Sequence, residues 1–154
     1  MIHAPEVPAG ALLPRGTLGL DIDGTITALP MYFARLSHTW RAAGCAVHII
    51  SSRSDRTEVH ASCVQELHEY GIAFDGIYLL PNLATAASAC PHVNLSPYQK
   101  YLWQKVAIAR SLGVTVYFDD DANVVDIFRR FAPDVCVYRI DVRAHYARSR
   151  ISSC

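Results

Sequence analysis

Two aspartates near the start of the chain have a spacing that suits a pair of catalytic carboxylates. Residues 17–21, Thr-Leu-Gly-Leu-Asp, form an apolar run that ends at Asp21, and Asp23 follows two positions later. Because side chains alternate along an extended chain, Asp21 and Asp23 point to one side while Ile22 points to the other. Gly24 then allows the backbone to turn sharply. The pattern predicts a buried strand that opens into a reactive turn with two carboxylates.

The Asp-Gly pair is also a common signal for a β-hairpin, in which acidic side chains only solvate the turn. A hairpin needs a second alternating strand after the turn. Instead, Pro30 stands at a plausible first helical position, apolar residues recur at helical spacing, and Gly44 supplies a stop. We therefore interpret this segment as a strand, a turn and a helix.

Apolar segments alternate with helical segments along the rest of the chain. The expected strands are residues 17–21, 46–50, 74–80, 114–118 and 135–140, and the expected helices are residues 31–43, 56–70, 96–112 and the segment that Asp121 caps. Five apolar strands alternating with four helices predict an α/β fold, a single Rossmann-like, doubly wound parallel sheet. Residues 81–95 are expected to be irregular.

The composition fits one compact domain with no dominant charge. The chain has 154 residues, of which 51% are hydrophobic and 18% charged, with 14 basic and 14 acidic side chains. The zero formal net charge gives no overall field that would attract nucleic acid or an anionic membrane. Five cysteines without C-x-x-C spacing favour a reducing, cytoplasmic compartment. No apolar run approaches the roughly 20 residues that a membrane helix needs.

Both ends of the chain are expected to lie outside the folded domain. Residues 1–16 contain three prolines and lack the pattern of a secretion signal, so we interpret them as a flexible lead-in. Residues 17–142 are expected to form the domain, and residues 143–154 a basic tail.

Polar residues follow three of the expected strands at the point where each strand ends. They are Asp21 and Asp23, then Ser51, Ser52 and Arg53, then Asp119 and Asp120. Ligands of open α/β sheets bind outside the carboxyl ends of the strands, so these side chains are expected to meet at one rim. Clustered carboxylates repel one another and shift their pKa values, which a bound cation relieves. Oxygen ligands without neighbouring histidine or cysteine favour Mg²⁺.

These segments resemble the motifs of the haloacid dehalogenase-like (HAD) superfamily of phosphohydrolases. Asp21-Ile-Asp-Gly-Thr25, Ser51, Lys100 and Asp119-Asp120 occur in the order and context of its four motifs, across residues 17–140. The resemblance implies a Mg²⁺-dependent phosphatase. Asp21 would be the nucleophile that forms an aspartyl phosphate, and Asp23 the general acid and base.

The resemblance also implies the ligands of the metal ion and of the phosphoryl group. Asp119 and Asp120 would hold the metal together with the Asp21 carboxylate and the Asp23 backbone carbonyl. The residues implied in binding phosphate or substrate are Gly24, Thr25, Ser51, Ser52, Arg53 and Lys100.

The sequence contains only two lysines, Lys100 and Lys105, and helix geometry separates them. At 100° per residue they lie about 140° apart, so they cannot both face one site. Lys100 is in the first turn of its helix, where the dipole disfavours a cation, and this position is explained if Lys100 reaches a phosphate and Asp21. Lys105 is interpreted as part of a solvated face. Lys100 is therefore predicted to be the catalytic lysine.

The short spacing between the motifs predicts a phosphatase without a sizeable cap domain. Only six residues separate Gly24 from Met31, and one helix and one strand use most of residues 53–99. An uncovered site would admit a bulky substrate such as a polynucleotide end, unless another subunit or residues 81–95 cover it.

Within the superfamily, three segments look most like the 3′-phosphatase domain of phage-type polynucleotide kinase-phosphatases: Ser51–Arg53, Tyr98–Lys105 and Phe118–Arg130. Three features depart from that pattern: there is no G-x-x-x-x-G-K-[ST] loop, Asp121 stands where a basic residue is expected, and the net charge is zero. Two other readings stay open. One is a small-molecule phosphatase, acting on a nucleotide or sugar phosphate, whose site is closed by oligomerisation. The other is a non-catalytic phosphate-binding module.

Overall fold

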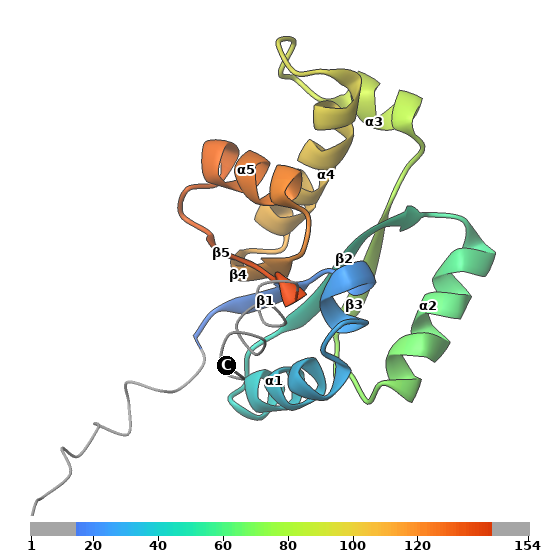
Figure 1. Ribbon diagram of the computed structural model, residues 1–154, viewed down its shortest axis with the longest axis vertical. Helices are drawn as coiled ribbons and strands as arrows, with labels where there is room; N and C mark the ends of the chain where they lie inside the picture. The colour runs from blue at the N-terminus through green and yellow to red at the C-terminus, as the bar shows by residue number, and fades with distance from the viewer. Residues whose placement is uncertain (1–14, 143–154) are drawn as a thin grey trace, which may run out of the picture.

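A five-stranded, all-parallel sheet forms the centre of the molecule (Figure 1). The computed structural model describes residues 15–142. The strand order is β3-β2-β1-β4-β5, and the strands are β1 Thr17–Leu20, β2 Val47–Ser54, β3 Gly76–Leu80, β4 Val114–Asp119 and β5 Cys136–Arg139. The predicted α/β class and the parallel sheet of five strands are confirmed.

Helices cover both faces of the sheet (Figure 1). They are α1 Pro30–Ala42, α2 Thr57–Glu69, α3 Leu83–Ala89, α4 Pro97–Ser111 and α5 Ala122–Phe131. Between β1 and α1 the chain forms the turn η2 Ile22–Ile26, in which Asp23 and Gly24 have non-helical backbone angles. Within residues 15–142, no helix has the length and apolar character needed to cross a membrane. The described residues also contain no inserted cap domain between the strands, as the motif spacing predicts.

The alternation of side chains along the buried strands creates two separate cores. Leu18, Leu20 and Ile49 pack on the side of α1 and α2. Ile50 and Tyr117 pack on the other side, against α4 and α5. Because apolar side chains point into a core from both faces of β1, β2 and β4, these strands appear in the sequence as nearly continuous apolar runs.

Two segments differ from the prediction. Residues 81–95 are not wholly irregular, because they contain the short helix α3, whose N-cap Asn82 accepts a hydrogen bond from the Thr85 backbone N–H at 2.9 Å. Its alanine-rich sequence has no apolar periodicity, so the pattern did not indicate a helix. Strand β2 also continues through Ser51, Ser52 and Arg53 to Ser54, which pairs with Leu80.

The predicted helix caps are confirmed at two positions. Ser96 and Gln99 form a reciprocal capping box at the start of α4. Asp121 caps α5, and its side chain accepts from the Asn123 backbone N–H at 2.8 Å. Most of the predicted lead-in, residues 1–16, and all of the predicted tail, residues 143–154, lie outside the described residues.

Gly19 allows the ring of Tyr117 to lie flat against the sheet. The two residues are neighbours in the β1–β4 register, and the Tyr117 ring stacks on Phe128 with centroids 4.5 Å apart. A Cβ atom at Gly19 would lie 2.7 Å from Tyr117 Cδ2 and 3.2 Å from Val114 Cγ1. This close approach requires glycine at position 19.

Gly19→Ala should therefore destabilise the fold by about 1–3 kcal/mol, because overpacking forces strands or side chains to shift. Urea unfolding measures the change in the free energy of unfolding. The same substitution made together with Tyr117→Leu should cost less, since leucine leaves room for the new methyl group. An equal cost in both backgrounds would show that the tyrosine ring does not impose the glycine.

Candidate active site

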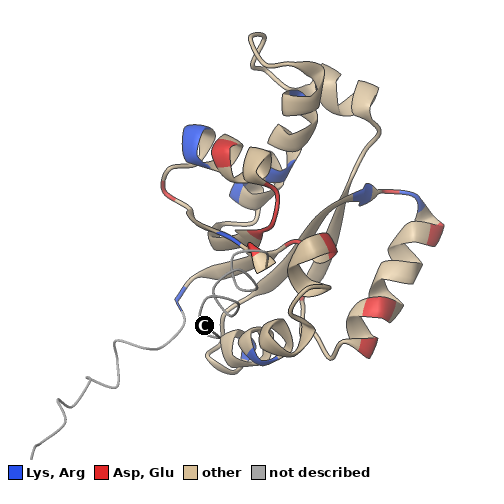
Figure 2. Cartoon of the chain, viewed as in Figure 1, with Lys and Arg blue, Asp and Glu red and all other residues tan. Residues whose placement is uncertain are grey.

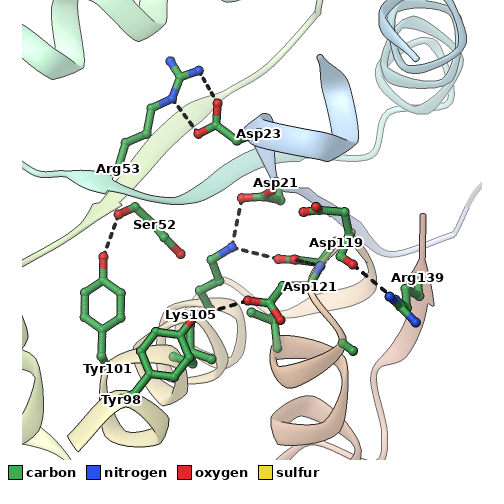
Figure 3. A pocket seen from close by; sticks show the side chains of 14 residues that line it. Asp21, Asp23, Ser52, Arg53, Tyr98, Tyr101, Lys105, Asp119, Asp121 and Arg139 are labelled. Atoms are coloured by element: carbon green, nitrogen blue, oxygen red, sulfur yellow. Dashed lines mark hydrogen bonds and ion pairs between the residues drawn. The ribbon is translucent and has the colours of Figure 1, made fainter. Parts of the chain in front are cut away.

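A cavity of about 620 Å³ lies at the carboxyl ends of the central strands. It is lined by polar side chains from β2, β4, β5 and α4 and from the turns that follow β1 and β4 (Figure 3). These residues are Asp21, Asp23, Ser52, Arg53, Tyr98, Tyr101, Lys105, Asp119, Asp120, Asp121 and Arg139. The strand-end rule thus brings together residues that are distant in the sequence.

Lys105 reaches between two buried carboxylates at the floor of this cavity (Figure 3). Its Nζ donates to Asp21 Oδ1 at 2.9 Å and to Asp119 Oδ2 at 2.8 Å. The three side chains are only 3%, 6% and 1% exposed. Burial alone would lower the pKa of Lys105, but attraction to Asp21 and Asp119 outweighs it and raises the pKa above its usual value. Lys105 is therefore a charged ammonium in the protein interior.

The lysine beside Asp21 is Lys105, and the prediction that Lys105 faces solvent is wrong. Helix α4 buries Leu102, Lys105, Val106 and Ala109, which occupy positions i, i+3, i+4 and i+7 on the helix. Lys105 thus belongs to the core-facing stripe. Lys100 is half-buried and does not line the cavity. The sequence did contain the signal, because a lysine within an apolar stripe requires a buried anionic partner.

Burial dominates the ionisation of Asp21. It raises the pKa of this carboxyl to about 7, a rise that Lys105 limits and that repulsion from Asp119 increases. The Thr25 hydroxyl donates to the second oxygen, Asp21 Oδ2, at a long distance of 3.4 Å. Oδ2 is therefore the less engaged of the two carboxylate oxygens.

The Asp119 carboxylate is fixed by three hydrogen bonds. Its Oδ2 accepts from Lys105 and from the hydroxyl of the fully buried Tyr117, at 3.0 Å. Its Oδ1 accepts from the Asp121 backbone N–H, also at 3.0 Å. Tyr117 was not predicted as a site residue, because a tyrosine inside an apolar strand is expected to pack in the hydrophobic core.

Three carboxylates could hold a metal ion. Asp21, Asp119 and Asp120 each offer an oxygen, and these atoms all lie within 4.8 Å of one another. Burial and repulsion from Asp119 raise the pKa of Asp120. One ammonium, that of Lys105, lies among three carboxyl groups, so a divalent cation would balance the remaining charge. The oxygen donors suit a hard cation.

Gly24 gives Asp120 the space that it occupies. Its φ is +75°, and a Cβ atom there would overlap the Asp120 carboxylate. The Gly24 backbone N–H donates to the Thr27 hydroxyl at 2.9 Å. Both the conformation and the close approach require glycine at this turn.

Asp23 forms an ion pair with Arg53, on the side of Asp21 that lies away from Asp119 (Figure 3). Arg53 Nε donates to Asp23 Oδ2 at 2.9 Å, and Nη2 donates to Oδ1 at 2.7 Å. These hydrogen bonds lower the pKa of Asp23. The guanidinium also contacts Glu66 of α2, a residue that the sequence did not indicate because it lies outside the strand ends.

The two serines of β2 take different positions. Ser51 is buried, and its hydroxyl accepts from the Arg53 backbone N–H at 3.3 Å. Ser52 lines the cavity, and its carbonyl accepts from the Tyr101 hydroxyl at 2.6 Å. On the far side, Arg139 of β5 donates from Nε to the Asp120 carbonyl at 3.2 Å. Arg139 follows the same strand-end rule but was not predicted.

No protein-family model matches the sequence, and no curated protein matches it either. The fold is similar to that of a chain in the structure of the Pnkp1/Rnl/Hen1 RNA repair complex, with a TM-score of 0.54 and 15% identity over 83% of this chain and 42% of that one. A chain in a second structure of the Pnkp1/Rnl/Hen1 complex gives a TM-score of 0.54 and 18% identity over 81% of this chain and 45% of that one. The chain spans less than half the length of these two chains. At such identities the likeness establishes the fold.

Lys105→Met should destabilise the fold by about 3–5 kcal/mol, because it leaves two buried carboxylates without their cation. Urea unfolding in the presence of a chelator measures this cost, at a pH well above the wild-type Asp21 pKa of about 7, because loss of Lys105 raises the pKa of Asp21 further. The matched control is Lys100→Met on the same helix, which should change stability by less than about 0.5 kcal/mol. Equal effects of the two substitutions would contradict the buried position of Lys105.

Proposed function

We propose that this chain is a Mg²⁺-dependent phosphomonoesterase of the HAD type that works through an aspartyl phosphate on Asp21. The observation that carries the proposal is the buried bridge of Lys105 between Asp21 and Asp119, with Asp120 beside it. Such a cluster is costly to bury and is poor support for stability alone. Phosphoryl transfer through an aspartyl phosphate uses this combination, a positioned carboxylate nucleophile beside fixed positive charge.

The chain's own residues provide both steps of the reaction. Asp21 Oδ2, the less engaged oxygen, attacks phosphorus, and the bond from phosphorus to the ester oxygen breaks. Asp23 must leave Arg53 and take up a proton from solvent before this step, because Arg53 lowers the pKa of the Asp23 carboxyl. The protonated Asp23 then gives its proton to the ester oxygen. In the second step the Asp23 carboxylate takes a proton from water, whose oxygen attacks the phosphorus of the aspartyl phosphate. Inorganic phosphate leaves and the Asp21 carboxylate is regenerated.

Fixed positive charge would support this chemistry. Lys105 holds Asp21 through Oδ1 and leaves Oδ2 as the less engaged oxygen, and Arg53 and Ser52 line the same cavity. Asp21, Asp119 and Asp120 would hold the metal ion. Bound Mg²⁺ would offset negative charge on the phosphoryl oxygens.

We propose a polynucleotide 3′-phosphate end as the substrate. The cavity is open, without an inserted cap in the described residues, and two tyrosines form part of its wall. The rings of Tyr98 and Tyr101 stack at 27° with centroids 6.4 Å apart, and Tyr98 is half exposed. Stacking on such rings is a common way to hold an unpaired base.

The alternative is a small-molecule phosphatase, and the charge distribution favours it. Lys and Arg residues are spread over several elements (Figure 2), and the formal net charge of the chain is zero. A polynucleotide-binding surface usually gathers basic residues on one face. A nucleotide or sugar phosphate would require closure of the site by a second subunit.

A panel of phosphorylated substrates, assayed with Mg²⁺, tests both the proposed phosphatase activity and the proposed substrate. The chain should hydrolyse phosphomonoesters, and excess chelator should stop turnover because the carboxylate cluster loses its cation. The value of kcat/KM for a 3′-phosphorylated oligonucleotide should exceed that for mononucleotides, sugar phosphates and the 5′-phosphorylated oligonucleotide by at least about tenfold. Preference for a small ester would support the alternative instead.

Asp21→Asn is the control variant for the panel, since asparagine keeps the shape and loses the attacking charge. It should be folded and inactive. Asp126→Asn on the exposed face of α5 should remain active. Undiminished turnover with chelator, or in Asp21→Asn, would disprove the proposed mechanism.

A further inference from the structure

All five N–H groups of the Arg53 guanidinium have acceptors. Asp23 accepts from Nε and from Nη2. Glu66 Oε1 accepts from Nη2 at 3.2 Å, Glu66 Oε2 accepts from Nη1, and Cys63 Sγ accepts from Nη1 at 3.4 Å. An arginine has five such donors and no more. Arg53 can therefore bind a phosphoryl group only if one of its present partners leaves.

The partners of Arg53 differ in how firmly they are held. Glu66 and Cys63 both come from α2, where Cys63 is fully buried and the Glu66 side chain is only 27% exposed. Asp23 lies in the cavity, and its side chain is 63% exposed. An exposed carboxylate gains little net free energy from an ion pair, because water competes for both charges. Asp23 is thus the partner that an incoming anion can displace.

A phosphoryl group fits the place that Asp23 occupies. The guanidinium presents Nε and Nη2 side by side to two carboxylate oxygens, and the same pair of donors binds two phosphate oxygens. Asp23 in this position cannot act on a leaving group, because Arg53 engages both of its oxygens. Binding of the substrate and release of Asp23 would be one exchange.

We propose that Glu66 is a positioning residue, which holds Arg53 at the cavity while the guanidinium exchanges Asp23 for the phosphoryl oxygens of the substrate. This inference rests on the proposed phosphatase function and adds a residue to it. Glu66 fixes one edge of the guanidinium through Nη1 and Nη2, so that the other edge stays directed at the cavity. Without Glu66, the long arginine side chain would lose this fixed orientation.

The proposed exchange predicts that loss of Glu66 and loss of Asp23 change the affinity for phosphate in opposite directions. Glu66 supports the arginine, so its loss should weaken phosphate binding. Asp23 competes with phosphate for the arginine, so its loss should strengthen phosphate binding even though turnover falls. A purely structural ion-pair network would give neither pattern.

The test measures the dissociation constant of inorganic phosphate in the presence of Mg²⁺, by calorimetry and as a competitive inhibitor. Glu66→Gln should bind phosphate about tenfold more weakly than the wild type, and Asp23→Asn at least about threefold more tightly. Glu58→Gln is the matched control on the same helix, because Glu58 pairs with Arg56 at 3.5 Å on the exposed surface. It should bind phosphate like the wild type.

A double-mutant cycle separates the exchange from general charge repulsion. In an Arg53→Gln background, Asp23→Asn should no longer tighten phosphate binding, since the donors for which they compete are gone. Asp121→Asn, which also removes a charge from the cavity, should give a smaller gain than Asp23→Asn. The inference would be overturned if Asp23→Asn still raised the affinity for phosphate in the Arg53→Gln background. It would also be overturned if Asp121→Asn raised that affinity as much as Asp23→Asn does.

The failure of this inference differs from the failure of the proposed function. If the wild type hydrolyses phosphomonoesters but Glu66→Gln binds phosphate equally well, the positioning role of Glu66 is wrong. If the wild type neither binds phosphate nor hydrolyses esters, both the proposed function and this inference are wrong. Melting temperatures show whether each variant folds. If Glu66→Gln does not fold, the double-mutant cycle of Asp23 and Arg53 tests whether phosphate displaces Asp23 from Arg53.

Discussion

The ion pairs of Lys105 with Asp21 and Asp119 are the interaction on which the rest of the site depends. They tie α4 to the ends of β1 and β4 within a volume from which water is almost excluded. Removing three charged groups from water costs several kcal/mol for each ion, and mutual attraction offsets this only when the geometry is good. In other proteins, hydrophobic residues of similar size often stabilise the fold as well as a buried ion pair does, or better. The proposed chemistry at Asp21 therefore explains this arrangement better than stability does.

Several features of the fold serve to hold these groups in place. Strand β1 lies between β2 and β4, so its carboxyl end meets residues from both neighbours. Glycine at position 19 leaves room for the Tyr117 ring, and the hydroxyl of that ring holds Asp119. Glycine at position 24 leaves room for Asp120. The order and spacing of small residues along the strands thus determine where the carboxylates lie.

The strand ends were predictable from the sequence, but contacts between distant side chains were not. Apolar runs that stop at polar residues indicate both the sheet and the polar rim at its carboxyl edge, which is why the cavity residues Asp21, Asp23, Arg53, Asp119 and Asp120 could be named. Lys105 was wrongly placed on a solvated face, and Lys100 beside Asp21, because a weak helix-dipole argument was preferred to the stronger burial pattern of α4. Glu66 and Tyr117 carry no local signal, since their role appears only when α2 and β4 pack beside the site.

Trapping the covalent intermediate tests the central claim, that Asp21 is the nucleophile, most directly. An aryl phosphate needs no acid for its leaving group, so the Asp23→Asn variant with Mg²⁺ should accumulate the intermediate, and borohydride should reduce the acyl phosphate to homoserine. The tryptic peptide that follows Arg15 and ends at Arg35 contains both positions, and fragmentation distinguishes them by mass spectrometry. We predict homoserine at position 21. Turnover of the aryl phosphate with aspartate intact at position 21 would contradict the account.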